Sequence, residues 1–81
     1  GEASALVHVP GAEGARLGGS SGARVNSSGF AVVPNLTAFQ NNTVEIDPEG
    51  MSMDVELQES TRNVVPTSGA VSLVKFDTLS G

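Results

Sequence analysis

The chain lacks cysteine, tryptophan and tyrosine, and it carries only four basic side chains among its 81 residues. Without cysteine, neither a disulfide framework nor a thiolate zinc site can form. The basic residues are scattered and the net charge is −5, so the clustered positive surface that nucleic acid requires is excluded. Apolar runs are only a few residues long, far short of a membrane-spanning helix. We therefore expect neither nucleic acid nor membrane contact.

The residues that are present favour a small all-β domain. Runs of Val, Leu, Ile and Ala of strand length alternate with clusters of Gly, Pro, Asn and Ser, and no stretch shows sustained helical periodicity. Aliphatic burial must supply most of the stability, at about 25 cal/mol per Å² of apolar surface. We predict that residues 1–81 form a single small antiparallel two-sheet β-sandwich, plug-like or Ig- or transthyretin-like, with no helix of significance.

The strongest local signal is the segment from Gly22 to Pro34. Its central Asn-Ser-Ser-Gly favours a chain reversal, because Asn and Ser bond nearby backbone and Gly29 tolerates positive φ. We expect a hairpin here, with Arg24-Val25 leading in and the strand Phe30 to Val33 leading out. Pro34 is expected to end that strand, since proline lacks the ladder donor.

Further strands follow from apolar alternation. In the first, Ala3 to Val9, we expect Leu6 and His8 on one face and Ala5, Val7 and Val9 on the other. In Met51 to Glu59, Met53, Val55 and Leu57 are expected to point inward. The remaining predictions are a weak strand Ala15 to Leu17, a half-buried strand Thr43 to Asp47, a central strand Ala70 to Phe76, and a tail from Asp77 to Gly81.

No motif of the sequence carries catalysis. His8 is the only histidine, and we expect it to have a rim or packing role in a strand rather than to act in a triad. Asp47, Glu49 and Asp54 come closest to a cation cluster but lack the spacing of a calcium loop, and a solvated turn is the favoured interpretation. We expect no catalytic residue, no cofactor and no metal.

Three residues are candidates for contact with a partner protein. Leu36 and Phe39 are three residues apart, which would place them on one face of a helical turn. They either plug the end of the sandwich or form an exposed contact, and the sequence leaves both alternatives open. Arg62 is the third candidate.

The order of motifs resembles the outer-membrane usher family of bacterial chaperone–usher pilus systems. The resemblance rests on Ala5-Leu6-Val7 with Pro10-Gly11-Ala12, on Gly29 to Pro34, on Asn42 to Asp47, and on Val64-Val65-Pro66 followed by Gly69 to Phe76. It covers nearly the whole chain. Relatives often carry a tyrosine and a basic residue in the segment matching Thr37 to Gln40, where this chain has Phe39 and Gln40.

The resemblance implies the first of two C-terminal periplasmic domains that follow the transmembrane barrel, excised from a larger usher. It also implies a non-enzymatic role at the periplasmic face of the outer membrane, binding chaperone–pilin subunit complexes and other domains of the same usher during pilus assembly. The alternative is a structural accessory sandwich of the carboxypeptidase-regulatory or transthyretin-like kind, acting as a spacer in a larger exported protein.

Overall fold

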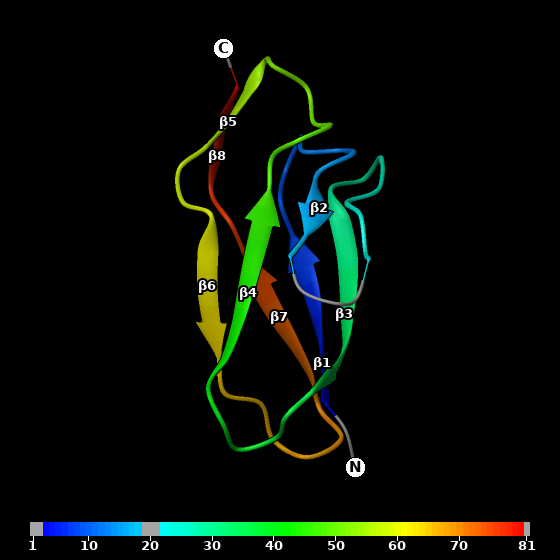
Figure 1. Cartoon of the computed structure of the whole chain (residues 1–81), viewed down its shortest axis with the longest axis vertical. Coiled ribbons are helices and arrows are strands. Elements are labelled where there is room, and N and C mark those ends of the chain that lie inside the picture. Colours follow the sequence, from blue (N-terminus) through cyan, green and yellow to red (C-terminus); the bar gives the residue numbers. More distant parts are fainter. Residues whose placement is uncertain (1–2, 19–21, 81) are drawn as a thin grey trace.

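A computed structural model describes residues 3–18 and 22–80 and shows an all-β fold (Figure 1). The described residues contain no helix, and hence none long and apolar enough to cross a membrane. The strands are β1 (Ala3–His8), β2 (Arg16–Leu17), β3 (Phe30–Leu36), β4 (Asn42–Asp47), β5 (Val55–Leu57), β6 (Thr61–Val64), β7 (Val71–Lys75) and β8 (Thr78–Ser80).

The strands form two facing sheets and a small ribbon. One sheet has the order β3-β1-β7 and the other β2-β4-β6, while β5 and β8 form a two-stranded ribbon beyond one end. The predicted small all-β sandwich is confirmed. The expectation of purely antiparallel strands is wrong in one place, because β7 pairs with β1 in parallel. The β6–β7 connection lets β7 enter its sheet in the same direction as β1.

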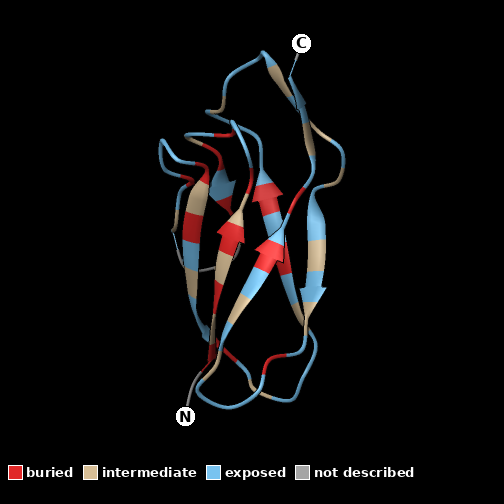
Figure 2. Ribbon diagram, turned by 180° about the vertical axis from the view of Figure 1, so that it is seen from behind, coloured by how far each residue is buried: buried red, intermediate tan, exposed pale blue. Residues whose placement is uncertain are grey.

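The core lies between the sheets and is aliphatic apart from Phe76. Along β1 the side chains of Ala5 and Val7 are buried, while Leu6 and His8 lie on the outer side, as the alternation predicts (Figure 2). On the opposite sheet Val44 and Ile46 of β4 are buried, again as predicted. Phe76, just after β7, is the largest side chain with almost no exposed surface.

The turn at Asn26 to Gly29 forms, but the hairpin predicted around it does not. Gly29 has φ 86°, and the Asn26 side chain accepts hydrogen bonds from the amides of Ser28 and Phe30. The strand after the turn pairs with β1, whereas the Val25 amide before it donates to the Ala15 carbonyl at 2.9 Å. The turn therefore carries the chain from one sheet to the other.

Pro34 does not end β3, which continues to Leu36. The register with β1 shifts here, from Ala5 opposite Val33 to Ala3 opposite Leu36. The extra residue forms a bulge in which Asn35 is left-handed, with φ 64°. A bulge on an edge strand tolerates proline, because its missing donor is not needed by the ladder.

Three predictions near the C-terminus are wrong. The predicted central strand, β7, is an edge of its sheet, and the predicted tail contains β8. The predicted strand Met51 to Glu59 is limited to β5, with a turn before it and a fully exposed Met53. Apolar residues in a segment do not reveal whether another sheet covers it, and here none of the described sheets does.

Candidate functional site

Phe39 stands on the short connection between β3 and β4, and its side chain is 70% exposed. Its backbone is left-handed, with φ 61°, and its amide donates to the Pro66 carbonyl at 2.7 Å. Val65, beside that carbonyl, is also exposed. We call the pair Phe39 and Val65 the end patch, because it lies on the connections at the end of the sandwich opposite the β5–β8 ribbon.

The connection that carries Phe39 is held by one side chain. The Asn42 carboxamide donates to the carbonyls of Thr37 (2.8 Å), Gln40 (2.9 Å) and Val64 (3.4 Å), and its oxygen accepts from the Thr37 amide at 3.0 Å. These bonds close the loop on itself and tie it to β6. The loop therefore has a defined shape although most of it is exposed.

Leu36 and Phe39 lie in different environments, since Leu36 is buried and Phe39 is exposed. Leu36 ends β3 opposite Ala3, is only 9% exposed, and belongs to the core. The helical turn that would bring Leu36 and Phe39 to one face does not form. The packing alternative therefore describes Leu36, and the exposed alternative describes Phe39.

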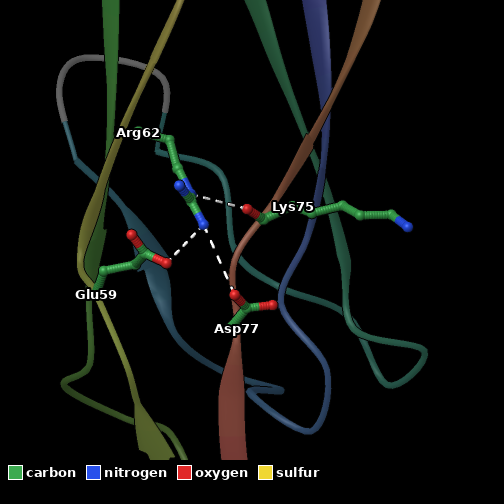
Figure 3. Close-up of polar contacts among 4 residues, drawn as sticks. All are labelled: Glu59, Arg62, Lys75 and Asp77. Atoms are coloured by element: carbon green, nitrogen blue, oxygen red, sulfur yellow. Dashed lines mark hydrogen bonds and ion pairs between the residues drawn. The ribbon is translucent and has the colours of Figure 1, made fainter.

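Arg62 joins the two sheets at one side of the sandwich. Its Nε donates to the Lys75 carbonyl of β7 at 3.0 Å, and its Nη2 forms an ion pair with Glu59 (Figure 3). Asp77 lies farther away, with Oδ2 at 3.8 Å from Nη2. The guanidinium thus has partners within the chain, and contact with an external partner stays a prediction.

The side of the β3-β1-β7 sheet that points away from the core is largely apolar and exposed, and the sequence analysis missed it. We call this side the outer face and define it by the rows of side chains given next. The register places Val32 of β3 and Leu73 of β7 on either side of Leu6. The next row contains Phe30, His8 and Lys75. Val71 extends the face along β7, and it is 70% exposed while Leu73 is 58% exposed. The sequence signal for this face was the apolar pair Val71 and Leu73, which alternates with the inward-facing positions of the same strand.

His8 packs against an aromatic ring on this face. The His8 and Phe30 rings stack at 4.3 Å between centroids, with an interplanar angle of 12°, so the packing role expected for His8 is confirmed. Across residues 3–18 and 22–80 no group of acidic or histidine side chains is placed to hold a metal. Asp47 instead accepts a hydrogen bond from the Glu49 amide at 3.0 Å, as in a solvated turn.

Comparison with known proteins assigns the chain to a family. Residues 1–76 match the family described as outer membrane usher protein. The chain belongs to the outer-membrane usher family. It is 42% identical to the outer membrane usher protein MrkC of Klebsiella pneumoniae over 78 residues, 96% of this chain and 9% of that protein.

Two further usher relatives cover the whole chain. The probable outer membrane usher protein ElfC of Escherichia coli K12 is 36% identical over 81 residues, and the outer membrane usher protein FimD of Salmonella typhimurium is 33% identical over 81 residues. The chain spans 9% of the length of each. Membership of the usher family, which the motif order indicated, is confirmed, and with it an outer-membrane protein as the context of this domain.

Proposed function

We propose that the chain is a non-catalytic periplasmic domain of a fimbrial usher that binds chaperone–subunit complexes during pilus assembly. Membership of the usher family over residues 1–76 supports the pathway. Since the relatives are about ten times as long as the chain, other domains of the same usher are further partners in this proposal. Protein contact at the surface, rather than chemistry in a cleft, is the mode of action.

The observation that carries the proposal is the state of Phe39. An exposed phenylalanine contributes little to a core, and a left-handed backbone costs a residue with a Cβ about 1 kcal/mol. Phe39 combines the two, at 70% exposure and φ 61°, while Asn42 holds the loop in shape. An exposed aromatic side chain on a loop whose backbone is fixed by hydrogen bonds is the kind of anchor that dominates protein interfaces. We assign Phe39 the central contact, with Val65 beside it.

Arg62 has a supporting part in this proposal. Its guanidinium remains partly exposed, with a side-chain exposure of 38%, and it fixes the position of β7 through the Lys75 carbonyl. A partner that covers this side of the sandwich would meet a charge network already neutralised by Glu59. We propose that Arg62 orders the surface more than it attracts a partner. Leu36 has a packing role in this proposal, since it lies in the core at the end of β3.

An NMR titration of the isotope-labelled chain with a purified chaperone–subunit complex tests the proposal. We expect amide signals of residues 37–41 and 64–66 to shift or broaden in one contiguous set. Phe39→Gly should weaken binding by about tenfold or more, as loss of an aromatic anchor does, while the fold stays intact. Asn35→Gly is the matched control, because Asn35 is also left-handed.

Two results would count against the proposal. A dispersed spectrum that does not change at high micromolar complex would leave the domain as a spacer, the role of the alternative interpretation. Equal affinity for the wild-type chain and Phe39→Gly would remove the end patch from the interface even if binding occurs.

A further inference from the structure

The backbone of β7 has one side that no described residue pairs. The Ser4 amide donates to the Ala70 carbonyl (3.0 Å), and the Phe76 amide donates to the His8 carbonyl (2.9 Å). Even-numbered positions of this segment therefore face β1. Because successive residues of a strand direct their N–H and C=O groups to opposite sides, Val71, Leu73 and Lys75 direct theirs away from β1.

One contact verifies this assignment. The Lys75 carbonyl accepts a hydrogen bond from Arg62 Nε, which approaches from the side opposite to β1. At Val71 and Leu73, by contrast, the outward N–H and C=O groups have no partner in the part of the chain that the structure describes. β6 and β7 lie closer together at the end of β7, where Arg62 bonds the Lys75 carbonyl, than at the start of β7 (Figure 1).

The other edge of the same sheet is protected against pairing. In β3, Pro34 supplies no donor, and the left-handed Asn35 bends the strand at its bulge. The Phe30 amide and carbonyl are already bonded to Asn26. Such features are how natural sheets block their edges. β7 has neither a proline nor a bulge, so its edge is the accessible one.

The side chains of β7 indicate what would pair there. Val71 and Leu73 are exposed on the outer face, and Leu73 continues the row of Leu6 and Val32. The Lys75 ammonium has no ion pair with a described residue and points away from the Arg62 cluster (Figure 3). In a chain of net charge −5, none of the described residues alternating along the outer face is acidic.

We propose that the free edge of β7 accepts an extended strand from a partner protein, adding a fourth strand to the β3-β1-β7 sheet. The strand has apolar residues at alternate positions, which extend the apolar row of the outer face, and one carboxylate that pairs with Lys75. Main-chain hydrogen bonds at Val71 and Leu73 supply affinity, and the alternating side chains and the carboxylate supply specificity. The inference rests on the proposed function, since it specifies how a protein partner is held.

Lys75 also opposes the pairing of two copies of the chain through this edge. Two β7 strands side by side would bring their lysines onto one acid-free sheet face. Lysine on an edge strand opposes such self-association. The same charge favours a partner strand that carries a carboxylate.

The test uses the labelled chain and a synthetic nine-residue peptide with valine at alternate positions, threonine between them and glutamate at one end. Without peptide, the amides of Val71, Leu73 and Lys75 should exchange with solvent rapidly, whereas those of Ser72 and Val74 should be protected. With saturating peptide, we expect exchange at Val71 and Leu73 to slow by at least tenfold. Unchanged exchange at these two amides would overturn the proposal without any variant.

Two variants sharpen the result. Leu73→Pro removes an amide that the fold does not use, and this variant should abolish the peptide's protection of the Val71 amide from exchange. Val32→Pro removes an outward amide of β3 instead and should leave that protection unchanged. Lys75→Glu should lower the affinity for the glutamate peptide about fivefold, the scale of an exposed ion pair. A peptide with lysine in place of glutamate should restore the affinity for this variant. Equal binding by Leu73→Pro, or no recovery in the charge exchange, would contradict the proposed pairing.

The same variants separate this inference from the proposed function. If a chaperone–subunit complex binds the chain and Leu73→Pro equally well, strand addition is overturned and recruitment stands. If the complex does not bind but the peptide protects Val71 and Leu73, recruitment fails and the edge is confirmed as a strand acceptor. If neither binds, both are overturned.

Discussion

Arg62 of β6 donates from Nε to the main-chain carbonyl of Lys75 in β7, at a distance of 3.0 Å. The bond links two strands that belong to different sheets and that have no ladder between them. The ion pair with Glu59 holds the guanidinium in the orientation that this bond requires. One side chain thus joins the two layers at the side where both sheets end.

Replacing Arg62 with alanine should loosen this side of the sandwich. We expect the free energy of unfolding to fall by about 1–2 kcal/mol, since a charge-assisted hydrogen bond is lost while the exposed ion pair adds little. Urea denaturation measures the change. Arg24→Ala is the control, because that exposed side chain has no such bond with a described residue, and the free energy of unfolding should change by no more than about 0.5 kcal/mol. Equal effects of the two substitutions would contradict the role of Arg62.

Gly14 and Gly50 bring two turns into contact that no larger residue would allow. A Cβ at Gly14 would lie 2.6 Å from the Gly50 carbonyl oxygen, and φ there is 92°. Gly14→Ala should therefore lower the free energy of unfolding by about 2–4 kcal/mol, through both clash and backbone strain. Thermal unfolding measures the loss.

Gly69→Ala separates the two causes. Its φ is 73°, but nothing lies within 4 Å of an added Cβ, so only the backbone term of about 1 kcal/mol applies. If alanine at position 69 cost as much as alanine at position 14, steric contact between the turns would not be the reason.

Phe76 is expected to be the most sensitive core position. It is 1% exposed, and removing a buried aromatic side chain costs about 3–5 kcal/mol. A domain of this size has about 4–12 kcal/mol in total, so Phe76→Ala should remove at least about a quarter of the free energy of unfolding. Urea denaturation measures the loss, and amide dispersion is lost as well if the total is at the low end of that range. Phe39→Ala is the control, and it should keep full dispersion. A well-dispersed Phe76→Ala spectrum with nearly unchanged stability would show that the core does not depend on this ring.

The sequence predicted local features well and pairing partners poorly. Alternation identified the buried face of β1, and Asn26 to Gly29 identified a turn, because both depend on neighbouring residues. The same turn suggested a hairpin. β3 instead pairs with β1, whose residues lie 22 to 33 positions earlier in the chain, because packing between the sheets decides the pairing partner.

The candidate surfaces were predicted less well for the same reason. Phe39 was a candidate from its apolar character and its place in a connection, and its exposure agrees with one of the two alternatives, while contact with a partner stays a prediction. The open edge at Val71 and Leu73 was missed, because an apolar run with no covering layer looks like a central strand. Only the topology shows that β7 lies at an edge. Family membership came from motif order rather than from any single site.

Asn42 couples the stability of the β3–β4 loop to the position of Phe39. Its side chain makes four hydrogen bonds, to Thr37 twice and to Gln40 and Val64. Asn42→Ala should lower the free energy of unfolding by about 2 kcal/mol. The loss is smaller than that of four full hydrogen bonds, because most of the freed backbone groups can form hydrogen bonds with water instead. Urea denaturation measures this loss.

Asn42→Asp gives a sharper result. Aspartate keeps the oxygen that accepts from Thr37 but loses the donors, and it places a negative charge against three carbonyls. We expect it to be at least as destabilising as alanine at neutral pH, and Asn41→Ala, an exposed neighbour, to be nearly neutral. Both position-42 variants should also weaken binding of a chaperone–subunit complex, because Phe39 loses its fixed orientation. Full affinity in a variant whose 37–41 amide signals have moved would show that the loop geometry does not matter for recruitment.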